Sequence, residues 1–115
     1  MNSEQLSRFI AELSLAKKAE DIIIMDLKKL TSFTDYFVIC SADSDSQVKA
    51  ISDHITEELK KQQVKVWHVE GYQASTWILM DLVDVVVHIF RPEVRKFYAL
   101  EKLWGDAKIT RVADQ

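Results

Sequence analysis

Residues 76–90 read TWILMDLVDVVVHIF, and this stretch decides the fold. The runs 76–81 and 84–90 are rich in the β-branched and aromatic side chains that favour strands. Only Leu82 and Val83 separate the two runs, and strands joined by so short a turn pair as an antiparallel hairpin. The sequence therefore predicts a hairpin at the centre of the domain.

The first strand of this hairpin has two different faces, because successive side chains of a strand point to opposite sides. Trp77, Leu79 and Asp81 lie on one face, and Ile78 and Met80 on the other. Both faces are largely apolar, so we expect both to be covered by other parts of the molecule.

The residues before the hairpin predict two helices and three strands. Apolar side chains recur at helical spacing in residues 3–18, with Asn2 or Ser3 as a cap. Ser44 and Gln47 have capping-box spacing and open a second helix that runs to about residue 61. Three apolar runs are typical of strands: residues 22–25, 35–40 and 64–69. A strand, a helix and a strand in this order predict a right-handed parallel crossover.

The segment after the hairpin predicts a final helix, with Pro92 in its first turn and Gly105 as its C-terminal cap. Its expected buried side carries Val94, Phe97, Leu100 and Trp104. We expect a domain over residues 1–107 and a C-terminal tail over residues 108–115. The fold class is a single-domain α/β protein with a mixed sheet of roughly five strands and about three helices.

The coverage of the sheet has two interpretations. Three helices of these lengths leave part of one apolar face open, and Asp81 and Asp84 then border a surface for protein interaction. Alternatively, the sheet is fully buried within the monomer.

The composition excludes several classes of function. The 115 residues include only two glycines and one proline. Dinucleotide-binding and Walker A motifs need clustered glycines, because the backbone must approach phosphate closely. His54, His68 and His88 do not form the three or four converging ligands that zinc needs. Asp81 and Asp84 flank the turn without the Gly-Ser pair of a nucleotidyltransferase. We therefore expect no metal, no cofactor and no catalysis.

Charge is unevenly distributed along the chain. Residues 1–90 hold nine basic and fourteen acidic side chains, a balance of −5, whereas residues 91–111 hold six and three, a balance of +3. An acidic body suits a basic protein better than a nucleic acid. The basic stretch is compatible with a contact to RNA or with a solvated helix face that complements its own C-terminal dipole.

Other features indicate a cytoplasmic protein without membrane association. Cys40 lies in an apolar run and is typical of a buried structural thiol. The longest uncharged run, residues 71–80, has half of the ~20 residues that a membrane helix requires. The N-terminus carries charges where a secretory signal would be apolar.

Several short segments, in their order and spacing, resemble one known family over about residues 5–107. They are Asp21-Ile22, TDYFVICS at 34–41, Ser46-Gln47-Val48, Glu70-Gly71, WILMD at 77–81, DVVVHIF at 84–90 and RKFYALEKLW at 95–104. Together they resemble the ribosomal silencing factors, also called Iojap-like proteins. The resemblance implies an α/β fold related to nucleotidyltransferases but without their active site.

The resemblance also implies an activity. Members of that family repress translation: they bind the large ribosomal subunit through its fourteenth large-subunit protein and sterically block association with the small subunit. It further implies a homodimer when free, and the basic stretch adds a minor contact with ribosomal RNA. One departure concerns the hairpin turn, which reads Asp-x-Gly-Asp in the family and Asp81-Leu82-Val83-Asp84 here. Valine resists a positive φ, so either the turn type differs or Val83 faces the partner.

We expect the partner-binding residues to be Trp77, Leu79, Asp81, Leu82 and Tyr98. Aromatic anchors dominate such interfaces, and the carboxylate of Asp81 would supply specificity more than affinity. On this interpretation Trp77 belongs to the interface and not to the core. Trp77→Ala would then weaken binding and leave the fold intact.

Overall fold

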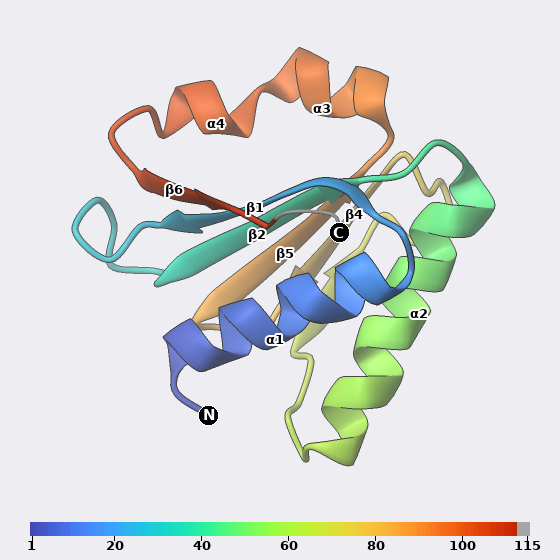
Figure 1. The fold of residues 1–115 in the computed structure, drawn as a ribbon, viewed down its shortest axis with the longest axis horizontal. Helices are drawn as coiled ribbons and strands as arrows, with labels where there is room; N and C mark the ends of the chain where they lie inside the picture. Colours follow the sequence, from blue (N-terminus) through green and yellow to red (C-terminus); the bar gives the residue numbers. More distant parts are fainter. Residues whose placement is uncertain (113–115) are drawn as a thin grey trace.

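The computed structural model describes residues 1–112, which form a single mixed sheet with helices on both faces (Figure 1). The elements in chain order are α1 (Ser3–Ala16), β1 (Glu20–Asp26), β2 (Tyr36–Ser41), α2 (Asp45–Lys61), β3 (His68–Glu70), β4 (Trp77–Asp81), β5 (Val85–Phe90), α3 (Pro92–Tyr98), α4 (Leu100–Leu103) and β6 (Lys108–Arg111). The six strands are ordered β3-β4-β5-β2-β1-β6. The α/β fold class is confirmed, with one strand more than expected.

The two long helices begin at side-chain caps. The Asn2 side chain accepts a hydrogen bond from the Gln5 backbone N–H at 2.8 Å, and the Gln5 side chain accepts one from the Asn2 N–H at 3.0 Å. Ser44 caps α2 by accepting from the Gln47 N–H at 3.1 Å. The Gln47 side chain donates to the carbonyl of Lys17 at 3.2 Å, so it ties the start of α2 to the end of α1.

Two hydrophobic clusters lie on opposite faces of the sheet. α1 and α2 cover the first face, and α3 and α4 lie over the second (Figure 1). The first cluster is the larger one, and it includes Cys40. Burial raises the pKa of the Cys40 thiol to about 12, so the prediction of a buried structural thiol is confirmed. The buried residues of the second cluster are Ile23, Met25, Leu27, Phe37, Ile39 and Phe90.

The hairpin is confirmed, because β4 and β5 pair antiparallel with Trp77 opposite Phe90. The third strand is displaced relative to the prediction: β3 covers His68–Glu70 instead of residues 64–69. The crossover through α2 is parallel as predicted, but the two strands that it joins are not adjacent. α2 leads to β3, which runs parallel to β2 but is separated from it by β5 and β4, and the adjacent parallel partner of β2 is β5.

The sixth strand lies in the segment that the sequence suggests as a tail. Lys108–Arg111 pairs antiparallel with β1, where Ile109 is opposite Met25. A strand of four residues with one apolar side chain has almost no periodicity, so the sequence does not reveal it. Residues 113–115 of the expected tail lie outside the described residues.

The final helix is divided in two. Ala99 has a φ of 46°, in the left-handed region, and it ends α3 before α4 begins. Val94, Leu100 and Trp104 pack against the second cluster as predicted. The prediction for Phe97 is wrong, because its side chain is 80% exposed. The seven-residue α3 turns Arg95 toward the sheet and Phe97 away from it. Ala99, and not Gly105, takes the left-handed position.

Candidate partner-binding site

The predicted face of β4 exists and is incompletely covered. Trp77, Leu79 and Asp81 are partly exposed, and they alternate with the buried Ile78 and Met80. The three residues share the sheet face that carries the second cluster, and they stay partly exposed although α3 and α4 lie over this face (Figure 1). Of the two interpretations of sheet coverage, the structure therefore has the partly open one.

The strand register identifies the neighbours of these residues. Leu79 lies opposite His88, and Asp81 lies opposite Val86, on β5. On the other side, Glu70 of β3 lies opposite Leu79. We define the β4 surface as Trp77, Leu79, Asp81, Val86 and Tyr98. The sequence missed Val86 and His88 as members of this region, although the hairpin register could have identified both.

Trp77 has a role in the core as well as at the surface. Its ring stacks on Phe90 at a centroid distance of 4.9 Å and contacts Tyr98 at 4.7 Å. Its indole Nε1 donates a hydrogen bond to Nδ1 of His88 at 3.1 Å. These contacts exist in the free protein, so we now expect Trp77→Ala to lower the stability of the fold as well as to weaken binding.

Gly71 allows the loop between β3 and β4 to pass close to the backbone of Trp77. It has a φ of 80°, and a Cβ atom there would lie 2.1 Å from the Trp77 carbonyl oxygen. Any other residue would have to displace the backbone at the start of β4. The sequence shows this glycine and predicts the strand over residues 76–81, but it does not show how closely the two approach.

His88 is a buried neutral side chain. It is 3% exposed, and burial lowers the pKa of its imidazole to about 3. Phe37 packs edge-on against its ring at 4.5 Å. Its Nε2 atom is buried and has no hydrogen-bond partner among residues 1–112.

The hairpin turn has a left-handed residue at position 83 although valine stands there. Val83 has a φ of 73°, the left-handed conformation that glycine adopts without strain. Asp81 stabilises this turn, because its Oδ1 accepts a hydrogen bond from the Val83 N–H at 2.8 Å. The interpretation of Asp81 as a turn carboxylate agrees with this bond. Val83 is 49% exposed beside the β4 surface.

The remaining predicted residues differ in accessibility. Leu82 is 6% exposed and packs in the first cluster, so its side chain is not available to a partner in this conformation. Tyr98 is 50% exposed and lies between Trp77 and Phe97. Phe97 was expected in the core, and its exposure adds an aromatic ring next to the β4 surface.

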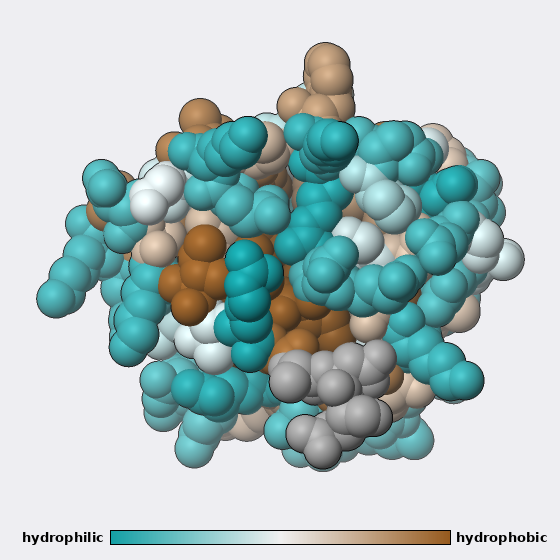
Figure 2. Space-filling model, turned by 45° about the horizontal axis from the view of Figure 1, so that its top comes forward, coloured by the Kyte–Doolittle hydropathy of each residue, from teal (hydrophilic) through white to brown (hydrophobic). Residues whose placement is uncertain are grey.

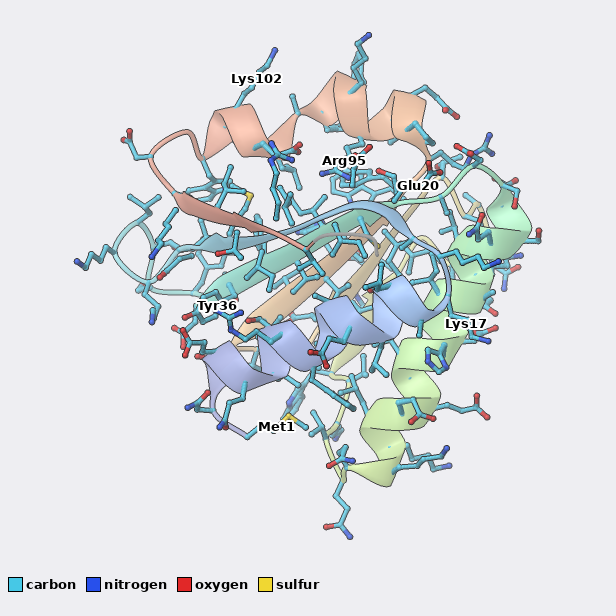
Figure 3. The ribbon with its side chains drawn as sticks, in the orientation of Figure 1. Met1, Lys17, Glu20, Tyr36, Arg95 and Lys102 are labelled. Carbon is cyan, nitrogen blue, oxygen red and sulfur yellow. The ribbon has the colours of Figure 1, made fainter. Side chains whose placement is uncertain are left out.

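The basic stretch is partly used for internal contacts. Arg95 is buried, and its Nη1 donates to the Asp21 carbonyl at 2.7 Å and to Ser41 Oγ at 2.8 Å. Arg91 donates to Asp45 at 2.8 Å. In Figure 3, Arg95 points from α3 to the sheet, whereas Lys102 points away from the body. These two arginines are structural.

No group of three or more His, Cys, Asp or Glu side chains within residues 1–112 is arranged to hold a metal ion. His68 and Glu70 form a pair at 3.4 Å on β3, and both are exposed.

Within residues 1–112, no helix has both the length and the apolarity to cross a bilayer. On the face shown in Figure 2, hydrophobic side chains form separate areas among hydrophilic ones.

Comparison with known proteins identifies close similarities. The family described as "Ribosomal silencing factor during starvation" matches residues 1–115. The chain is 40% identical to the ribosomal silencing factor RsfS of Bacillus subtilis over 109 residues, which cover 95% of this chain and 92% of the relative. It is 40% identical to the chloroplastic protein Iojap of Zea mays over 100 residues, which cover 83% of this chain and 43% of that protein.

A solved structure has the same fold. The crystal structure of a Chromobacterium violaceum protein has a TM-score of 0.89 and 35% sequence identity, and the match covers 98% of this chain and 94% of that chain. A Bacillus halodurans structure has a TM-score of 0.75 at 35% identity, over 95% of this chain and 94% of that chain.

Proposed function

Because the chain belongs to the ribosomal silencing factor family, we propose that it represses translation by binding the large ribosomal subunit through the fourteenth large-subunit protein. The bound domain then sterically blocks association with the small subunit. The observation that carries this proposal is the partly open, acidic and apolar β4 surface.

The chemistry of the β4 surface suits a basic protein. Trp77 and Tyr98 supply aromatic rings of the kind that dominate interface energetics, and Leu79 lies beside them on the strand. The Asp81 carboxylate adds a negative charge that complements the lysine- and arginine-rich surfaces of ribosomal proteins. The net charge of −5 over residues 1–90 disfavours a primary contact with ribosomal RNA.

The steric part of the proposal follows from size. The domain measures 35 × 34 × 30 Å, and the two ribosomal subunits approach each other closely where they join. A rigid body of these dimensions on the joining face of one subunit occupies space that the other subunit needs. The repressor requires no catalytic step.

Further parts of the proposal concern the state of the protein in the cell. It acts in the cytoplasm and forms a homodimer when it is not on the ribosome. Lys96, Lys102 and Lys108 are exposed and supply a minor contact with ribosomal RNA. The β4 surface supplies the main contact.

Sedimentation with purified large and small subunits tests the proposal. We expect the protein to sediment with large subunits and to reduce the yield of joined ribosomes. Tyr98→Ala should weaken this binding by about tenfold or more, since an anchor residue contributes at least ~1–2 kcal/mol. Phe33→Ala is the matched control, because Phe33 is a 64% exposed aromatic residue on the β1–β2 loop.

Three outcomes would contradict the proposal. They are sedimentation with small subunits alone, undiminished joining at saturating protein, and equal effects of the Tyr98 and Phe33 substitutions. Binding to naked ribosomal RNA with a steep dependence on salt would indicate direct RNA recognition instead.

A further inference from the structure

His88 is a polar side chain inside an aromatic cluster. Its ring centroid lies 4.5 Å from that of Phe37, 5.9 Å from that of Trp77 and 6.0 Å from that of Phe90. A buried polar atom without a hydrogen bond costs free energy, and His88 Nε2 is such an atom. An apolar side chain would avoid this penalty. The hydrogen bond of Nδ1 is therefore the contribution that distinguishes histidine at this position.

The hydrogen bond with Trp77 determines the tautomer of His88. An indole N–H can only donate, so Nδ1 must be the unprotonated acceptor and the neutral ring carries its proton on Nε2. Burial lowers the pKa of the imidazole to about 3, which keeps the ring neutral at physiological pH. Nδ1 of His88 thus accepts the Trp77 hydrogen bond under all ordinary conditions.

The same hydrogen bond selects one orientation of the Trp77 ring. Stacking on Phe90 and contact with Tyr98 hold the plane of the indole. These two contacts alone do not determine which edge of the indole faces His88. Only one edge carries the N–H group that reaches His88. A fixed ring needs no ordering when a partner binds, and this saves the entropy that a mobile side chain would lose.

We propose that His88 is a positioning residue, which holds the Trp77 indole in the orientation that the ribosomal partner contacts on the β4 surface. This inference rests on the proposed function, because it assigns His88 a role in that same surface. His88 itself lies beneath the surface and acts through Trp77.

Two substitutions at position 88 distinguish the effect of losing the hydrogen-bond acceptor from the effect of losing the volume of the ring. His88→Leu removes the acceptor and also the unpaired Nε2–H, whereas His88→Asn places an amide oxygen close to the position of Nδ1. We expect His88→Leu to weaken binding to large subunits about five- to tenfold in the folded fraction. We expect His88→Asn to bind within about twofold of the wild type.

The orientation of the Trp77 indole can be measured separately from binding. The chain has three tryptophans, so a ¹⁵N NMR spectrum contains three indole N–H signals, and Trp77→Phe identifies the one from Trp77. Hydrogen exchange of this signal should be slow in the wild type and in His88→Asn, and faster in His88→Leu. In the Trp77→Phe background, His88→Leu should cause no further loss of binding.

Equal binding by the wild type and His88→Leu would overturn the inference. So would a loss of equal size in the Trp77→Phe background, since that would show an effect independent of the hydrogen bond. If His88→Leu does not fold, Trp77→Phe removes the donor instead, and normal binding by that variant would overturn the inference. A wild type that does not bind large subunits would overturn the proposed function, and this inference with it.

Discussion

The two faces of the sheet are covered by helices of different length and chemistry. On the first face, α1 has 14 residues and α2 has 17, and both bury apolar stripes. On the second face, α3 has seven residues and α4 has four, and the one buried residue of this pair is Arg95. The first face is therefore held by hydrophobic burial, whereas α3 and α4 are held by partly buried apolar side chains and by the polar contacts of Arg95.

The difference in helix cover affects both the stability of the fold and the apolar surface that remains for a partner. Long amphipathic helices remove nearly all apolar surface from water, which stabilises the fold but leaves nothing for a partner. The short α3 and α4 leave Leu79 and Asp81 partly exposed and Trp77 at the boundary between core and surface. The second face can therefore support an interface because its cover is incomplete.

The largest expected effect contrasts the two faces directly. Ile55 of α2 is completely buried in the first cluster, so Ile55→Ala should destabilise the fold by about 4 kcal/mol through lost burial and a cavity. Leu79→Ala on β4 should cost less, about 2 kcal/mol, because that side chain is partly exposed. Urea denaturation measures both values. Equal destabilisation by the two substitutions would contradict the distinction between the faces.

The second largest effect concerns the contacts that attach α3 and α4 to the sheet. Arg95→Ala removes two hydrogen bonds and the 3.4 Å ion pair with Glu101, and should cost roughly 3 kcal/mol. Amide hydrogen exchange should rise in α3 and α4 before it rises in α1 and α2. Lys96→Ala, an exposed change on the same helix, is the control and should stay within about 0.5 kcal/mol. Uniform loss of protection in all four helices would show that α3 and α4 are not a separate unit.

A pH dependence follows from the lowered pKa of His88. Its pKa is about 3 in the folded protein and 6.5 ordinarily, so between these values the unfolded chain binds more protons and stability falls as pH falls. The stability is complete above pH 6.5, and about 2 kcal/mol should be lost at pH 5. Denaturation at pH 7 and pH 5 should show this loss in the wild type relative to His88→Asn, which cannot titrate there. Parallel losses in both proteins would assign the effect to other groups.

The smallest expected effect is a stabilisation. Val83 is a β-branched residue at a φ of 73°, and the left-handed conformation costs about 1–2 kcal/mol for such a residue. Val83→Gly removes this strain but increases the entropy of the unfolded chain, so the net gain should be about 0.5–1 kcal/mol. Val83→Ala retains a Cβ atom and should change the melting temperature less. A loss of stability in Val83→Gly would show that the exposed valine packs more than its exposure suggests.

Local patterns in the sequence predict much of this molecule. The alternation in residues 77–81 predicts which side chains face the first cluster, and Ile78 and Met80 are indeed buried there. The Ser44 cap of α2 and the β4–β5 hairpin are also predicted, because capping and tight turns depend on residues only a few positions apart.

The accessibility of the proposed partner-binding residues could be predicted only in part. Leu79 and Asp81 are partly exposed, but Leu82 is buried, because the turn directs its side chain back into the first cluster. Phe97 was predicted as a core residue on the assumption of one continuous helix. The left-handed Ala99 interrupts that helix, and no local rule identifies alanine at such a position.

The sequence by itself determined the two long helices, the hairpin, the acidic body and the family to which the chain belongs. Each of these depends on the spacing of neighbouring residues or on composition. The tertiary structure alone decided that β6 pairs with β1 and that Arg95 joins α3 to Asp21. These contacts join residues 74 to 88 positions apart, so they depend on strand order and register, which no local periodicity encodes.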